Sequence, residues 1–203
     1  WAPKADTIDY NQRKLADSVA IQMINRRLEG AARRAGSAFL QAGIDVDDVS
    51  RSANGTFVSI VPSARGWEQA LREVRAIIED AKASVPGEAE IEREYRAFET
   101  NLAVDVENQS VEASATQAGN IVAAVDIRET TVTAQAALDI YRGARAIMTP
   151  AAMLDATRRM FGGDAMRAML VLPQMEAGAQ ARLDAALQAP VVASSDVRLT
   201  GKP

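Results

Sequence analysis

One stretch of this 203-residue chain, residues 38–62, has the pattern of a β-hairpin, and helical periodicity lies on both sides of it. An Asn54-Gly55 pair divides the stretch, and Asn-Gly favours a type I′ turn because both residues tolerate a positive φ. The pattern therefore predicts two antiparallel strands that meet at this pair. Their apolar residues are Phe39, Leu40, Ile44, Val46 and Val49 in the first half and Phe57, Val58, Ile60 and Val61 in the second.

Apolar residues at helical spacing occupy most of the remaining chain. A long helix is predicted to begin after Asp6 or Thr7, either of which is a suitable N-cap, and to end near residue 35. Thr149 as a cap and Pro150 in the first turn mark another start. The further predicted helices are residues 66–84, 88–101 continuing to 125 with a break, 134–148, 149–161 and 175–187.

The last part of the chain contains one more strand signal. Residues 167–172 are almost entirely apolar and precede Pro173, which predicts a buried strand in the same sheet as the hairpin. This order of elements is typical of an α+β fold, with an antiparallel-rich sheet that several helices cover on one face. We expect one domain over residues 1–189 and a linker or tail over 190–203. Because the chain opens with Trp1 and a helix, we expect sheet strands that belong upstream.

Composition limits the core and the partners. Only 4% of the residues are aromatic although 48% are hydrophobic, so the core must be aliphatic and rich in alanine. The 23 basic residues are scattered among 27 acidic ones, which argues against a nucleic-acid partner because phosphate binding needs a concentrated positive face. No apolar run approaches the ~20 residues of a membrane-spanning helix, and no signal-peptide pattern opens the chain. We therefore expect no membrane span.

The chain contains neither histidine nor cysteine, which excludes most catalytic chemistry. Catalytic zinc sites draw mainly on His, Cys and carboxylates, and Ser–His–Asp and Cys–His systems need an imidazole. Carboxylate acid–base chemistry, a Ser–Lys pair or no catalysis remain, and no nucleophile or phosphate-loop motif occurs. We favour a chain that has no catalytic residues, no metal and no cofactor of its own.

Three charged groups have functional alternatives. Asp45, Asp47 and Asp48 offer oxygen ligands for calcium, but the Gly and the distal Glu of a calcium loop are missing, so a solvated strand face is the preferred interpretation. The four glutamates at positions 88, 90, 92 and 94 stand at a helix start, where negative charge complements the helix dipole. The Arg26-Arg27 pair is interpreted as a solvated helix face or an inter-domain contact.

Three stretches, taken together and in order, resemble a known family. The first is a helix with residues 24–29 (INRRLE) that leads into residues 38–43 (AFLQAG). The second joins residues 66–71 (GWEQAL) and 87–92 (GEAEIE), and the third joins residues 148–153 (MTPAAM) to the strand at 169–171. In this combination the chain is similar to the M16 (insulinase/pitrilysin-like) zinc metallopeptidases, in particular to the non-catalytic domain that follows the catalytic one in large bacterial members.

This resemblance implies an M16 or LuxS-like metallohydrolase type of fold, and it implies that zinc and catalysis belong to a different domain from this one. The family's H-x-x-E-H motif needs two His ligands, which this chain does not contain, so the resemblance places zinc in the catalytic domain of a parent enzyme. Family members also use an Arg and a Tyr beside the zinc to bind substrate. Their pattern falls on Arg33 and Phe39, where Phe lacks the hydroxyl donor, so a surface arginine is the preferred interpretation of Arg33.

The resemblance also implies partners and a location. We expect a non-catalytic domain that packs on the zinc-bearing domain of the same polypeptide and helps enclose peptide substrates, in the periplasm or cell envelope. The alternatives are a stand-alone helical interaction module and, last, a carboxylate enzyme. Because Leu15, Val19 and Met23 on the opening helix have no predicted upstream strand to pack on, we expect self-association, or pairing with the zinc-bearing domain, through that face and a sheet edge.

Overall fold

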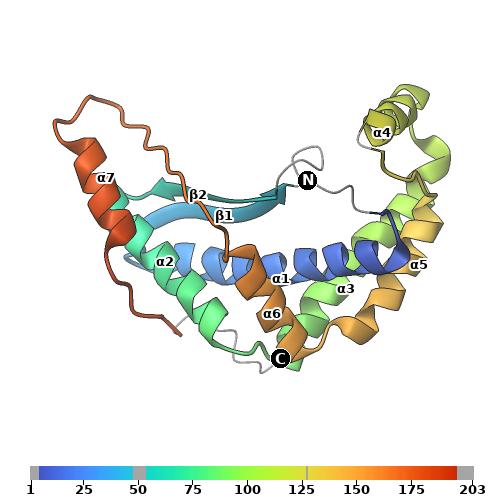
Figure 1. Ribbon diagram of the computed structural model, residues 1–203, viewed down its shortest axis with the longest axis horizontal. Coiled ribbons are helices and arrows are strands. Elements are labelled where there is room, and N and C mark those ends of the chain that lie inside the picture. Colours follow the sequence, from blue (N-terminus) through green and yellow to red (C-terminus); the bar gives the residue numbers. More distant parts are fainter. Residues whose placement is uncertain (1–4, 48–53, 127, 196–203) are drawn as a thin grey trace.

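The computed structural model describes residues 5–47, 54–126 and 128–195, and within them the fold is α+β with a two-stranded antiparallel sheet. Figure 1 shows α1 running through the middle, with the sheet on one side of it. The elements in chain order are α1 (Ile8–Ala32), β1 (Phe39–Asp47), β2 (Gly55–Pro62), α2 (Trp67–Ala83), α3 (Glu88–Asn108), α4 (Ser114–Asp126), α5 (Ala134–Ala144), α6 (Pro150–Met160) and α7 (Ala179–Gln188), with 3-10 turns η2 (Gln109–Val111) and η3 (Arg145–Ile147).

The caps predicted from the sequence are confirmed. The Thr7 hydroxyl accepts a hydrogen bond from the Tyr10 N–H at 3.2 Å and begins α1. Thr149 does the same for the Ala152 N–H at the start of α6, where Pro150 occupies the first turn. The break in the long central helix lies later than predicted, because α3 continues to Asn108 before the chain turns into α4.

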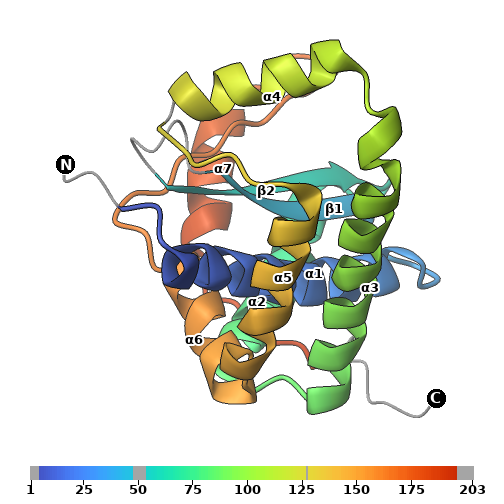
Figure 2. The ribbon, with the colours of Figure 1, turned by 90° about the vertical axis from the view of Figure 1, so that its right-hand side faces the viewer.

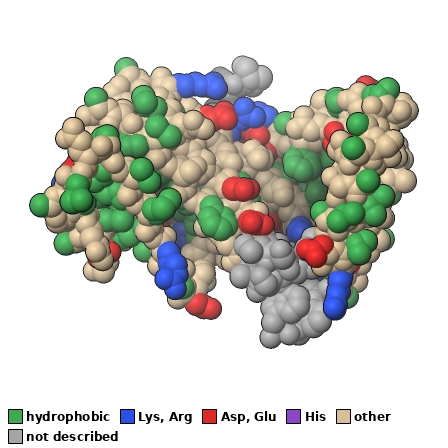
Figure 3. All heavy atoms as spheres, turned by 90° about the horizontal axis from the view of Figure 1, so that it is seen from above, with side chains coloured by type: hydrophobic (Ala, Val, Ile, Leu, Met, Phe, Trp, Pro, Cys, Tyr) green, Lys and Arg blue, Asp and Glu red, His purple; other side chains and the backbone are tan. Residues whose placement is uncertain are grey.

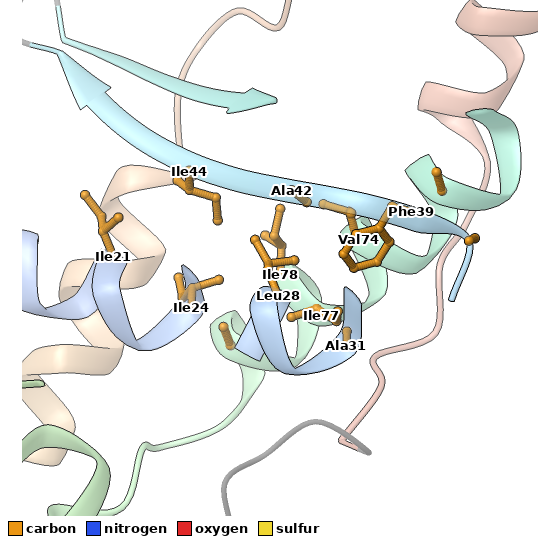
Figure 4. Close-up of a cluster of buried hydrophobic side chains, with 13 residues drawn as sticks. Ile21, Ile24, Leu28, Ala31, Phe39, Ala42, Ile44, Val74, Ile77 and Ile78 are labelled. Atoms are coloured by element: carbon orange, nitrogen blue, oxygen red, sulfur yellow. The ribbon is translucent and has the colours of Figure 1, made fainter. Parts of the chain in front are cut away.

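One side of α1 packs against the sheet and α2. Ile24, Leu28 and Ala31 point toward β1, where Phe39, Ala42 and Ile44 meet them (Figure 4). Val74, Ile77 and Ile78 of α2 close the same cluster. Burying apolar surface of this kind is worth about 25 cal/mol per Å2, so this cluster fixes the hairpin on the two helices.

The other side of α1 packs against α3, α5 and α6, as Figure 2 makes visible. Tyr141 is fully buried there; its ring stacks on Tyr95 at 4.9 Å between centroids, and its hydroxyl donates to the Tyr95 carbonyl at 3.0 Å. Val19 and Met23 are buried in this cluster, with Leu15 against it. The expectation that this face of the opening helix stays uncovered is therefore wrong, because downstream helices cover it.

The hairpin is confirmed, but its turn is not where the sequence placed it. Gly55 lies inside β2, opposite Asp47, and it has no positive φ. A Cβ at Gly55 would come within 2.8 Å of the exposed Phe57 ring, two residues further along the same strand. The predicted strand residue Val49 and the candidate ligand Asp48 lie outside the described residues.

The predicted third strand is wrong. Residues 167–172 have no regular structure, and the sheet described here contains only β1 and β2. Met169 is 87% exposed and Val171 80% exposed, so the segment is not buried either. An apolar run identifies a strand only where a neighbouring strand supplies backbone partners, and this segment pairs with none of the described strands. Among the described helices, none combines the length and the apolar character needed to cross a bilayer.

Candidate interaction surface

The two candidate substrate-binding residues lie at the junction of α1 and β1. Arg33 is the exposed C-cap residue of α1 and pairs with Glu29 at 3.7 Å. It lines a shallow depression of about 170 Å3 together with Leu40 and Gln41. The Phe39 side chain points the other way, into the core below the sheet (Figure 4). The structure thus places Arg33 at the surface and Phe39 in the interior.

The aspartates of β1 lie along the exposed part of the strand. Asp45 stands opposite Phe57 in the ladder, and its carboxylate accepts a hydrogen bond from the Val46 N–H at 3.0 Å. Asp47 is also exposed, at the end of β1. Among the residues that the structure describes, no three His, Cys, Asp or Glu side chains gather as metal ligands would.

Buried charges lie behind the sheet, where α1, α2 and α3 meet. Arg27 is only 4% exposed and holds Glu90 with two hydrogen bonds of 2.8 Å each, a bidentate pair. Its third contact is with Asp80 at 3.5 Å. The solvated-face interpretation is therefore wrong for Arg27, and Glu90 of the first turn of α3 is also its buried ion-pair partner. The signal was present in the sequence, because Arg27 lies on the same helical face as Ile24, Leu28 and Ala31.

A neighbouring pair of contacts completes this ion cluster. Glu94, also buried, accepts from Arg26 at 3.2 Å and from Arg93 at 3.1 Å. Three arginines are thus paired with three carboxylates. Arg26 and Arg93 share Glu94, and Arg27 contacts both Glu90 and Asp80. Since each of these charges has a partner of opposite sign, the ion pairs fix the three helices relative to one another.

A cleft of about 430 Å3 separates α2 from α7 and is lined by arginines. Arg75 reaches across it and donates to the Ala186 and Ala189 carbonyls at 2.7 and 3.0 Å, at the end of α7. Arg182 of α7 pairs with Glu68 at 2.8 Å and lies over the Trp67 ring. These two cations hold α7 on α2, which gives the cleft a structural role.

The outer face of the sheet is an apolar surface that α1 and α2 do not cover. Ala42 and Ile44 face α1, so their ladder neighbours Gln41 and Asp45, with Val61 and Phe57 opposite them, face outward. Leu40 is 68%, Phe57 55% and Val61 48% exposed. Figure 3 looks onto this side, where hydrophobic and acidic side chains share the surface. Exposed apolar patches of this kind mark interaction sites.

Helix α4 carries a second uncovered apolar stripe. Ile121, Val122 and Val125 are exposed and lie within one turn of one another, and Asp126 is the only charged residue of the helix. The helix projects beyond the end of α3 (Figure 2). The sequence pattern predicted a helix here but not that its apolar residues would lack cover.

Comparison of the chain with known protein families, with curated proteins and with solved structures found no match.

Proposed function

We propose that this chain is a non-catalytic domain of a multi-domain zinc metallopeptidase of the M16 kind, which packs on the zinc-bearing domain and helps enclose peptides. The observation that carries the proposal is the uncovered outer face of the sheet with Leu40, Phe57 and Val61. A face of this composition is suited to covering by another domain, because its burial removes apolar side chains from water.

The composition of the chain also supports a non-catalytic domain beside a zinc-bearing one. With no histidine and no cysteine, the chain has no imidazole or thiol ligand for zinc, so the metal of such an enzyme belongs to the other domain. The acidic side chains beside the apolar ones, Asp45 and Asp47 on β1, suit a surface that meets peptides or another domain through mixed contacts. The three motifs that resemble the family lie on α1 with β1, on α2 with α3, and on α6 with the segment after it.

The second candidate is a stand-alone interaction module. The stripe of Ile121, Val122 and Val125 on α4 favours it, because an exposed apolar helix face is a common protein-binding element that needs no zinc-bearing neighbour. The two candidates differ in the surface that they use, which is the sheet face in the first and α4 in the second.

The test begins with the complete gene product, in which the first candidate requires an H-x-x-E-H region outside this chain. That region and this chain are then purified separately, and their binding is measured by calorimetry. We expect Phe57→Asp and Val61→Asp each to weaken binding about tenfold or more, equivalent to about 1.4 kcal/mol, because a carboxylate is buried without a partner.

Val85→Asp is the matched control, since Val85 is exposed in the connection between α2 and α3, away from the sheet. Binding that survives both sheet-face substitutions, or a gene product without H-x-x-E-H, contradicts the proposal. Loss of binding to other proteins in Val122→Asp alone supports the interaction module instead.

A further inference from the structure

The two edges of the sheet differ in how their backbone groups are satisfied. On the β1 edge, the Asn25 side chain of α1 donates to the Ile44 carbonyl at 2.9 Å and accepts from the Ile44 N–H at 2.8 Å. The Asp45 carboxylate accepts from the Val46 N–H. Side chains therefore take the place of a neighbouring strand along the middle of this edge.

The β2 edge has no such cover. Since the backbone of Ile44 points away from β2, its ladder partner Val58 points away from β1, as do Thr56 and Ile60 by the alternation of the strand. Among the described residues, no backbone hydrogen bond reaches these N–H and C=O groups from outside the hairpin. β2 also lacks charged residues, which are the usual protection of a sheet edge.

An unpaired strand-like segment exists in the same chain. Residues 165–172 (AMRAMLVL) lie between Gly162-Gly163 and Pro173, have no regular structure, and expose Met166, Met169 and Val171. Eight residues are enough for a full strand. Arg167 is the only charge in the segment, so it has the low charge that favours strand pairing.

Both ends of the segment are fixed on the body of the protein. The Thr56 hydroxyl donates to the Met160 carbonyl at 2.6 Å, which ties the end of α6 to the start of β2. At the other end, Arg75 and Arg182 hold α7 on α2. Between these anchors the segment passes its own sheet without pairing with it (Figure 1).

We propose that two copies of this chain associate by reciprocal strand addition, with residues 165–172 of each copy pairing along the β2 edge of the other. One chain carries both halves of the contact, an open apolar edge and an unpaired apolar strand, so a pair of identical chains related by a two-fold axis satisfies both at once. The exchange buries Met169 and Val171 together with the exposed side of β2, and it forms the contact twice. This inference does not depend on the metallopeptidase proposal.

The first test measures the mass of the complete chain by analytical ultracentrifugation over a wide concentration range. We expect a monomer–dimer equilibrium. Val171→Lys places a charge in the exchanged strand and is expected to raise the dimer dissociation constant at least ~10-fold. Val192→Lys is the matched control, because Val192 is equally exposed but lies beyond α7, and it should leave the equilibrium unchanged.

The second test uses cysteine cross-linking, for which the cysteine-free chain is suited. An oxidised mixture of Met169→Cys and Ser59→Cys chains should give a disulfide-linked heterodimer, since the segment of one copy lies beside β2 of the other. A chain carrying both substitutions tests whether the segment pairs with its own edge. A strict monomer, a dimer that Val171→Lys leaves unchanged, or a disulfide that forms only within the doubly substituted chain each overturns the proposal.

Discussion

On one side of α1, the helices α3, α5 and α6 enclose a cluster around Tyr141, whereas on the other side β1 and β2 are covered by α1 and α2 on one face alone. The enclosed cluster contains two tyrosines and a phenylalanine in ring contact. The open side exposes Leu40, Phe57 and Val61. The difference teaches that packing by helices on all sides covers the apolar side chains around Tyr141, whereas packing on one face alone leaves the outer side chains of the sheet in contact with water.

The largest effect on stability is expected from removing the buried arginine that connects α1 with α2 and α3. Arg27→Ala removes the cation that holds buried Glu90 with two hydrogen bonds, and we expect a loss of about 3–5 kcal/mol in the free energy of unfolding. Urea denaturation measures it. Arg33→Ala, at an exposed position of the same helix, should change the unfolding free energy by no more than ~0.5 kcal/mol. Equal effects of the two substitutions would contradict a structural role for the buried ion cluster.

Truncating one side chain in the enclosed cluster and one on the outer face of the sheet tests whether the two regions differ in packing. Ile91→Ala on α3 removes a fully buried side chain and should cost about 2–5 kcal/mol. Val61→Ala on the outer face of β2 removes a half-exposed one and should stay within ~0.5 kcal/mol. The denaturation midpoints of the two variants, compared with that of the parent chain, measure these losses of stability. A large loss for Val61→Ala would mean that the outer face is already packed in the isolated chain.

A smaller change concerns the hydroxyl inside the enclosed cluster. Tyr141→Phe keeps the ring stacking but leaves the Tyr95 carbonyl without its 3.0 Å donor, so we expect a loss of about 1–2 kcal/mol. Burial raises the pKa of Tyr141, so its phenol should also fail to ionise until the protein unfolds at alkaline pH. Ultraviolet titration of Tyr141→Phe against the parent chain measures this. A Tyr141 phenolate formed in the folded protein would contradict the enclosed cluster.

The smallest effect is the pH dependence of the contact between α3 and α5. The hydrogen bond from Arg142 lowers the pKa of Glu99, and hydrogen bonds from Arg96 and Arg145 lower the pKa of Glu92, each from an ordinary value of 4.5. A carboxylate with a lowered folded-state pKa stabilises the fold above its unfolded value, and this contribution disappears as the pH falls through the folded-state pKa. We expect Glu99→Gln to flatten the acid side of the stability profile, and an unchanged profile would contradict this role of the pair.

Much of the fold was predictable because its signals are local. Thr7 and Thr149 each accept from an N–H group three residues further along the chain, and the positions of α1, α2, α5 and α6 follow from helical spacing. The turn predicted at Asn54-Gly55 was wrong for Gly55, which belongs to β2 although the pair has the sequence of a type I′ turn. What the pair of residues does not contain is the strand register, which places Gly55 opposite Asp47 in the ladder.

The buried ion pairs and the cover of the apolar faces were less predictable because they depend on contacts between distant residues. Arg27 and Glu90 are 63 positions apart, and only the packing of α1 on α3 brings them within 2.8 Å. The same limit explains residues 167–172, whose apolar sequence indicates a strand but says nothing about a partner edge. The expectation that Val19 and Met23 stay uncovered failed for the reverse reason, since helices far along the chain cover them.

The sequence by itself determined the α+β class, the hairpin strands, the starts of α1 and α6 and the lack of imidazole and thiol groups, because these follow from composition and from spacing over a few residues. Tertiary structure alone decided which apolar residues are covered, which charges are buried and which sheet edge stays open. Whether the apolar face of α1 around Val19 and Met23 is covered depends on helices more than 50 residues further along the chain. α1 ends at Ala32, whereas α3 begins at Glu88 and α5 at Ala134. No local pattern along the chain contains that information.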